Sequence, residues 1–327
     1  MIIENEALNE FHRLVKSGKV NPYEGTLKCG VDLGTANIVL AVTDENNHPV
    51  AGSTFASSVV RDGIVVDYMG AIRIVRDMKA ALEEKLGTTL TYGSCAIPPG
   101  ILEGNVKAIA NVVESAGFEV TAVVDEPTAA ASVLGIMDGG VVDVGGGTTG
   151  ISILKDGKVV FVADEPTGGT HMSLVLAGYF KVPFEEAEEI KKDTEREKEV
   201  FGIIRPVATK MATIVKRFME GQDVPVIYVV GGASCFQDFE SVFELVTEVP
   251  VYKANHPLLV TPLGIAYHCE TPATKARRER EEQERAAAQE KAQAEEKQKA
   301  PAAKSTKKKE TSSGKKSSGS SKTGKKA

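Results

Sequence analysis

Two segments of the chain repeat one pattern: an apolar strand that ends in aspartate, then glycine, then a hydroxyl residue and a second apolar strand. The copies are residues 31–37 (VDLGTAN) and 142–149 (VDVGGGTT), and their aspartates, Asp32 and Asp143, lie 111 positions apart. Glycine lets backbone N–H groups approach a ligand closely, and a run of such groups binds anions such as phosphate. Aspartates would repel phosphate, so they are better suited to hold Mg²⁺ through its waters.

One such hairpin alone could be an ordinary tight turn. The repeat, and the three consecutive glycines of the second copy, favour two facing domains that grip one polyphosphate and its metal. A third element follows: residues 224–230 form a continuous apolar run, typical of a strand buried on both faces. It ends in a glycine pair, against which a flat base or ribose could lie. This loop comprises Gly231, Gly232, Ala233 and Ser234.

Five blocks in this order resemble the actin/Hsp70/sugar-kinase ATPase superfamily. They are residues 32–35 (DLGT), 126–131 (EPTAAA), 143–149 (DVGGGTT), 230–233 (VGGA) and 263–266 (LGIA), spread over the whole globular part. Residues 126–131 and the glycine-rich second loop are closer to the Hsp70-like and MreB-like branches than to sugar kinases. Within the superfamily the chain most resembles the EutJ family of ethanolamine utilization proteins, on residues 62–68 (DGIVVDY), 168–172 (GGTHM) and 184–191 (FEEAEEIK).

The resemblance implies ATP and Mg²⁺ as cofactors and assigns a role to each matching residue. Asp32 and Asp143 would hold metal-bound waters, and Glu126 would orient the attacking water or a metal-bound water. The alternative for Glu126 is a helix N-terminal acid favoured by the macrodipole. The first phosphate loop would be Gly34, Thr35, Ala36 and Asn37, and the second Gly145, Gly146, Gly147, Thr148 and Thr149. Glu188 and Lys191 would clasp ribose and adenine, or alternatively belong to an exposed charged helix face. Residues 231–234 would form the adenosine loop.

The resemblance further implies a slow ATPase whose cleft closes when the γ-phosphate contacts both hairpins, in an ATP-dependent chaperone or assembly factor of ethanolamine utilization. The expected client is ethanolamine ammonia-lyase or a bacterial microcompartment protein. One alternative is a filament-forming or scaffolding nucleotide switch of MreB-like type. The other is a small-molecule kinase, although no acceptor-site acid stands between the two hairpins. The chain lacks the peptide-binding domain that follows the Hsp70 ATPase domain. We also find no counterpart of its phosphate-contacting lysine, because Lys79 and Lys85 belong to a helix expected to face elsewhere.

The order strand–strand–strand–helix–strand–helix occurs twice and predicts an α/β protein with two domains facing a cleft. Together with the resemblance, it predicts an actin-like ATPase fold of two duplicated RNase H-like domains around a nucleotide cleft, with a disordered charged C-terminal tail. The expected segments are 1–27 (an amphipathic helix and lead-in), 28–137 and 138–268 (the two ATPase domains) and 269–327 (the tail). The N-terminal helix is expected to pack on the core rather than to bind a partner. Helices 127–136 and 261–268 would connect the domains.

Charge separates the body from the tail. Residues 275–327 carry 17 basic and 8 acidic residues, a net charge of +9, whereas residues 1–274 carry 22 and 37, a net charge of −15. Residues 275–299 fit a solvated helix with i, i+4 ion pairs, and residues 300–327 are too poor in apolar residues to fold. The tail is either a solubilising extension or a contact for nucleic acid, anionic lipid or an acidic protein. No aromatic residue interrupts it, so we expect no specific nucleic-acid partner.

The remaining features indicate a cytoplasmic protein, with association with microcompartments as a further expectation. The N-terminus does not resemble a signal peptide, and no apolar run reaches the roughly 18 residues of a membrane span. The four cysteines lie among apolar neighbours without Cys-x-x-Cys spacing, which is typical of buried reduced thiols. They are Cys29, Cys95, Cys235 and Cys269. No histidine or cysteine spacing predicts a structural metal site.

Overall fold

The computed structural model describes residues 1–61 and 63–299, and for residues 286–299 only the backbone course. Residues Met1–Lys275 form one compact unit built around two sheets. The first sheet has the strand order β4-β3-β2-β7-β8. Strands β2, β7 and β8 are parallel to one another, and β3 pairs antiparallel with both β2 and β4. Its strands are β2 (Lys28–Leu33), β3 (Asn37–Thr43), β4 (Pro49–Ala56), β7 (Tyr92–Ile97) and β8 (Glu119–Asp125).

Helices α2 (Tyr68–Leu86) and α3 (Glu103–Ser115) cover this sheet with an apolar core that includes Val75, Leu82 and Val112. The ends of α2 follow from local chemistry. The Asp67 carboxylate accepts the Gly70 N–H at 2.9 Å as the N-cap, and Gly87 ends the helix in the left-handed conformation that glycine favours. A short hairpin of β5 (Val60–Arg61) and β6 (Ile64–Val65) lies between β4 and α2 in the sequence.

The second sheet has six strands in the order β1-β13-β12-β9-β10-β11. They are β1 (Ile2–Ile3), β13 (Val251–Ala254), β12 (Ile227–Val230), β9 (Gly139–Val144), β10 (Thr149–Lys155) and β11 (Lys158–Glu165). This sheet forms a second apolar core with four helices: α5 (Gly169–Phe180), α6 (Phe184–Lys192), α7 (Glu197–Phe218) and α8 (Phe239–Thr247). Strand β12 begins at Ile227, three residues later than the apolar run predicted, because a turn takes up the residues around Pro225.

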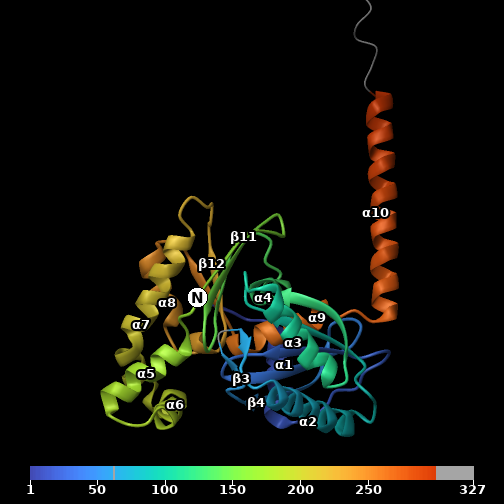
Figure 1. Cartoon of the computed structure of the whole chain (residues 1–327). Coiled ribbons are helices and arrows are strands. Elements are labelled where there is room, and N and C mark those ends of the chain that lie inside the picture. Colours follow the sequence, from blue (N-terminus) through green and yellow to red (C-terminus); the bar gives the residue numbers. More distant parts are fainter. Residues whose placement is uncertain (62, 300–327) are drawn as a thin grey trace, which may run out of the picture. The chain divides into compact units, whose positions relative to one another are not determined.

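Two connecting helices, α4 (Glu126–Leu134) and α9 (Val260–His268), pack against each other between the sheets (Figure 1). Helix α4 follows the first sheet but packs on β9 and β10 of the second, whereas α9 follows the second sheet but packs on β2 and β3 of the first. Glycines permit this close packing: a Cβ atom on Gly264 would lie 1.9 Å from the Ala129 carbonyl oxygen. The predicted connecting helices are therefore present. They cross between two lobes, each of which consists of one sheet and the helices packed on it.

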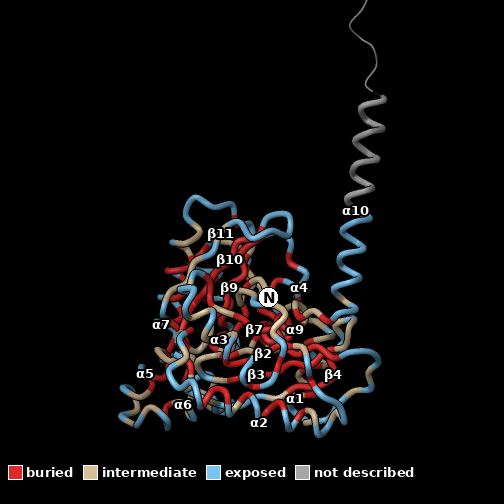
Figure 2. Tube along the Cα trace, turned by 45° about the vertical axis from the view of Figure 1, so that its right-hand side comes forward, coloured by how far each residue is buried: buried red, intermediate tan, exposed pale blue. Residues whose placement is uncertain are grey.

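The N-terminal segment also belongs to both lobes. Helix α1 (Glu6–Ser17) packs on β4 and buries Leu8, Phe11 and Leu14 completely, so the prediction of core packing is confirmed. Strand β1, which the sequence analysis did not predict, pairs in parallel with β13 of the second sheet. Figure 2 shows the buried residues concentrated in the central strands and in α9.

Helix α10 (Pro272–Lys299) contains the predicted solvated helix, and its first turns are exposed. The Arg278 guanidinium pairs with the Glu282 carboxylate at 2.8 Å with the expected i, i+4 spacing. A second unit begins at Ala276. Cys269 and Thr271, assigned to the tail by the sequence analysis, are instead buried in the body. The predicted disordered stretch, 300–327, lies outside the described residues. Within the described part of the chain, no helix has the length and apolar character needed to cross a bilayer.

Candidate functional site

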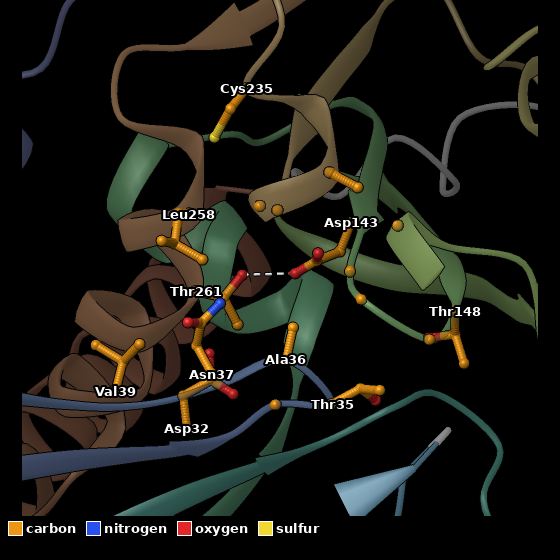
Figure 3. Close-up of a pocket in the computed structure, with 18 of the residues that line it drawn as sticks. Asp32, Thr35, Ala36, Asn37, Val39, Asp143, Thr148, Cys235, Leu258 and Thr261 are labelled. Atoms are coloured by element: carbon orange, nitrogen blue, oxygen red, sulfur yellow. Dashed lines mark hydrogen bonds between the residues drawn. The ribbon is translucent and has the colours of Figure 1, made fainter. Parts of the chain in front are cut away.

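The two predicted phosphate hairpins face one cavity of about 560 Å³ between the sheets. The first is the β2–β3 turn and the second is the β9–β10 turn, and Figure 3 shows residues of both on opposite sides of the cavity. The hairpins touch, because a Cβ atom on Gly146 would lie 3.0 Å from Ala36 Cβ and 3.3 Å from Thr35 Cβ. The structure thus brings together two loops that are 111 residues apart in sequence.

Nearly all the predicted site residues line this cavity: Asp32, Gly34, Thr35, Ala36, Asn37, Glu126, Asp143, Gly145, Gly146, Gly147, Thr148, Glu188, Lys191, Gly231, Gly232 and Ala233. Two predicted residues do not. The Thr149 hydroxyl donates to the Thr167 carbonyl at 2.6 Å, and the Ser234 hydroxyl donates to the Gly231 carbonyl at 2.7 Å. Both hydroxyls are buried and secure neighbouring backbone, so a direct contact of Thr149 or Ser234 with a cavity ligand is not supported.

Three carboxylic acids in the cavity wall have a raised pKa, with burial as the largest cause at each. Burial, and then the charge of Asp143, raise the pKa of Asp32 to about 7. Burial, and then the charges of Asp143 and Asp32, raise the pKa of Glu126 well above its ordinary value. The pKa of Asp143 is also raised by burial, an effect opposed by its hydrogen bond from Thr261. Such a set of acids favours a nearby cation, which would relieve the repulsion between the ionised forms.

A magnesium ion would fit this wall if two carboxylates held it through its waters. None of the described His, Cys, Asp and Glu side chains form a group of three that could hold a metal ion. Mg²⁺ beside nucleotide phosphates typically keeps several waters and takes only one or two carboxylates from the protein. Asp32 and Asp143, one from each sheet, match that limited donor set.

The Asp143 carboxylate accepts one hydrogen bond and lies close to the backbone of the adenosine loop. The Thr261 hydroxyl, in the first turn of α9, donates to Asp143 Oδ2 at 2.6 Å (Figure 3). Gly231, with φ of 89°, lies so close that a Cβ atom there would be 2.2 Å from Asp143 Oδ1. The sequence analysis missed Thr261, since nothing in residues 260–262 signals a contact with a loop 118 positions earlier.

The second phosphate loop rests on the start of α5. The Gly169 N–H donates to the Gly145 carbonyl at 2.9 Å, and the Thr170 N–H donates to the Gly146 carbonyl at 2.8 Å. Gly168 must be small there, because a Cβ atom on it would lie 2.7 Å from the Gly145 carbonyl oxygen. The start of α5 thus fixes the shape of the loop, and Gly169 itself lines the cavity.

Glu188 and Lys191 form a largely buried ion pair on α6. The Lys191 ammonium donates to Glu188 Oε1 at 2.6 Å, to the Ser173 hydroxyl at 2.7 Å and to the Gly169 carbonyl at 3.1 Å. Their side chains are only 17% and 14% exposed, so an exposed charged helix face is wrong for these two residues. Burial opposes the ionisation of Glu188, but the charge of Lys191 and the hydrogen bonds outweigh it and lower the pKa of Glu188.

Comparison with known proteins identifies the family. The chain is 45% identical over 238 residues to the ethanolamine utilization protein EutJ of Salmonella typhimurium strain LT2, covering 72% of this chain and 84% of that protein. It is 44% identical over 247 residues to EutJ of Escherichia coli K12, covering 74% of this chain and 86% of that protein. The chain belongs to the EutJ family. The crystal structure of EutJ from Carboxydothermus hydrogenoformans agrees, with 52% identity, a TM-score of 0.77, and coverage of 80% of this chain and 97% of that one.

Wider comparisons confirm the actin/Hsp70-like ATPase fold of this EutJ-family chain. Residues 68–223 match the Hsp70 protein family, and a 104-residue stretch is 35% identical to the chaperone protein DnaK of Thermus thermophilus, covering 30% of this chain and 17% of DnaK. MreB5 of Spiroplasma citri, solved with AMPPNP, shares the fold at 18% identity, with a TM-score of 0.61 and coverage of 74% of this chain and 95% of that one.

The lysines of α2 in this EutJ-family chain do not reach the cavity. Lys79 pairs with Glu83 at 2.6 Å and lies over the Phe118 ring, 5.1 Å from its centroid. Lys85 lies beside Gly18, and neither lysine lines the cavity. The sequence analysis did not predict the apolar wall beside the adenosine loop, where Cys235, Phe236 and Leu258 line the cavity.

Proposed function

We propose that this EutJ-family protein binds ATP with Mg²⁺ in the cavity and hydrolyses it slowly. One observation supports this above the rest: two glycine-rich hairpins, one from each sheet, meet at one cavity whose wall also holds Asp32, Asp143 and Glu126. Backbone N–H groups of residues 34–37 and 145–148 would bind the phosphates. Glu188, Lys191 and the loop from Gly231 to Ala233 would contact the nucleoside.

Asp32 and Asp143 would hold Mg²⁺ through its waters, and the bound ion would neutralise charge that develops on the phosphates. Glu126 is the proposed acceptor of a proton from the attacking water. Burial and the charges of Asp143 and Asp32 raise the pKa of Glu126, so a bound Mg²⁺ would favour the ionised carboxylate that can accept this proton. Its place at the first position of α4 keeps it in the cavity wall, and the Asp125 carboxylate caps that helix by accepting the Thr128 N–H at 2.9 Å.

The physical output of this chemistry would be closure of the lobes. A ligand that contacts both hairpins stabilises the closed arrangement by contacts that an open arrangement lacks. Helices α4 and α9, which cross between the sheets, are the proposed hinge. The names of the relatives support a place in ethanolamine utilization. There we propose an ATP-dependent chaperone or assembly factor, acting in the cytoplasm on ethanolamine ammonia-lyase or on microcompartment proteins.

Calorimetric titration tests the nucleotide site. ATP is titrated into the full chain with and without Mg²⁺, and then into Asp143→Ala. We expect Mg²⁺-dependent binding that the substitution weakens by about 1–3 kcal/mol, the scale for removing a charged hydrogen-bonding group. Asp77→Ala, which removes an exposed carboxylate on α2, is the matched control and should bind as the wild type does. Absence of binding heat with the wild type would overturn the nucleotide function.

Two further measurements separate the chaperone from the scaffold. ATP-dependent sedimentation or light scattering is expected of a filament-forming switch and not of a monomeric chaperone. Recovery of ethanolamine ammonia-lyase activity after dilution from denaturant should rise with this protein and MgATP, and Asp143→Ala should remove the gain. An equal recovery with the variant would contradict ATP-dependent assistance of that client.

A further inference from the structure

Thr261 uses its hydroxyl differently from three other threonines that lie in helices. Thr209, Thr213 and Thr247 each donate to the carbonyl four residues earlier in their own helix. Thr261 instead donates to the carboxylate of Asp143, 118 positions away, at 2.6 Å. Its side chain is buried and its residue lines the cavity, so this hydrogen bond lies in the wall of the proposed nucleotide site.

Both ends of the Thr261–Asp143 hydrogen bond are fixed by rigid elements. Asp143 is held between two neighbours in the second sheet, opposite Val230 of β12 and Gly150 of β10. Helix α9 lies directly on β2 of the first sheet, because Gly30 has no side chain there: a Cβ atom on it would be 2.4 Å from the Ala266 nitrogen and 2.6 Å from the Pro262 carbonyl oxygen. The hydroxyl therefore reaches Asp143 from a helix seated on the opposite lobe.

We propose that Thr261 is a positioning residue that fixes the orientation of the Asp143 carboxylate for the Mg²⁺–nucleotide complex. Its hydroxyl donates to Oδ2, and Gly231 leaves room for Oδ1 on the other side, so the hydrogen bond from Thr261 sets the orientation of the carboxylate. Oδ1 is then the oxygen that remains for a metal-bound water. This inference rests on the proposed function, because it assigns a task within the same site.

The test compares nucleotide affinity with and without Mg²⁺ in four proteins, by calorimetry on the full chain. They are the wild type, Thr261→Val, Thr261→Ser and the control Thr247→Val. Thr261→Val keeps the shape of the side chain and removes the hydroxyl. We expect it to weaken MgATP binding by about tenfold or more, the scale of a hydrogen bond to a charged group, and to change the affinity for ATP in EDTA by less than about twofold. Thr247→Val removes an equally buried hydroxyl far from the site and should leave both affinities unchanged.

Thr261→Ser restores the hydroxyl and should keep the Mg²⁺ dependence of the wild type. Thermal unfolding and far-UV circular dichroism confirm that each variant is folded. The inference is overturned if folded Thr261→Val binds MgATP as tightly as the wild type, or if it weakens ATP binding equally with and without Mg²⁺. Should the valine variant not fold, folded Thr261→Ser that has lost the Mg²⁺ dependence would overturn it equally. A wild type that binds no ATP would overturn the proposed function and this inference with it, whereas the other outcomes leave that function standing.

Discussion

At the scale of single residues, the cavity wall concentrates negative charge that the protein must tolerate when no cation binds there. Asp32, Asp143 and Glu126 are each shifted toward the protonated form by burial. Asp143 and Glu126 have partial compensation, from Thr261 and from a helix N-terminus. Residues arranged in this way serve ligand binding at the expense of stability. Their effect can therefore be measured as a change in the free energy of unfolding even without the ligand.

The pH dependence of stability tests this charge repulsion. The pKa of Asp32 is about 7 in the folded protein against 3.8 ordinarily, so the folded state binds the proton more tightly. Stability therefore falls as pH rises from about 4 through 7 and is lowest above 7. In EDTA without nucleotide, we expect Asp32→Asn to be more stable than the wild type at pH 8 by on the order of 1–3 kcal/mol, with the difference shrinking toward pH 4.

Urea unfolding at several pH values measures the Asp32→Asn difference. Asp77→Asn, an exposed substitution on α2, is the control and should follow the wild type at every pH. A constant difference between Asp32→Asn and the wild type from pH 4 to pH 8 would contradict the predicted origin in ionisation.

Gly231 offers a second test at this scale. An alanine there would combine a strained positive φ with a Cβ atom 2.2 Å from Asp143 Oδ1 and 2.5 Å from the Val144 carbonyl oxygen. We expect Gly231→Ala to lower the free energy of unfolding by roughly 2–4 kcal/mol and to weaken MgATP binding at least about tenfold, because Asp143 must move. Gly221→Ala is a matched control: its φ is 78°, with nothing within 4 Å of the added atom. It should cost roughly 1–2 kcal/mol and leave ATP affinity unchanged; equal losses of affinity in both variants would contradict the role of Gly231.

At the scale of elements, the crossing of α4 and α9 depends on small residues where the helices meet. Most helices and strands could be predicted from the sequence, because apolar periodicity and capping residues are local signals. The two-residue β1 and the four-residue β13 could not, since such short strands are defined by pairing with distant partners. The same reason explains the site: its glycine hairpins are local motifs, whereas Thr261 and the apolar wall at Cys235, Phe236 and Leu258 become visible only after folding.

Gly264→Ala tests the helix crossing. The added Cβ atom would lie 1.9 Å from the Ala129 carbonyl oxygen, and backbone cannot yield easily between two packed helices. We expect a loss of at least about 3 kcal/mol in the free energy of unfolding, measured by urea denaturation. Gly178→Ala in α5 is the helical control, because its added atom meets nothing within 4 Å, and it should be neutral or stabilising by up to about 1 kcal/mol. Similar effects of the two substitutions would show that the contact between α4 and α9 can accept an added methyl group, contrary to what the packing indicates.

At the scale of the whole molecule, an acidic body, residues 1–274, is followed by a basic segment, residues 275–327. Residues Met1–Lys275 form a compact unit that contains every residue of the proposed site. A chain shortened to end at Lys275 should therefore keep the MgATP affinity of the full chain within about twofold, as measured by calorimetry. A chain ending at residue 259 lacks α9 and should not fold, because α9 fills the contact between α4 and the first sheet. Lower affinity of the Lys275-terminated protein would assign the tail a part in nucleotide binding.

The pairing of β1 with β13 has a consequence for synthesis on the ribosome. Ile2 and Ile3 pair with Lys253 and Ala254, so one of the first strands to emerge must await one of the last. At roughly 5–20 residues per second, the separation of 251 positions between Ile2 and Lys253 means a delay on the order of 10–50 s. The nascent chain can bury α1 against β4 early, but β1 can join the second sheet only after β13 has been synthesised.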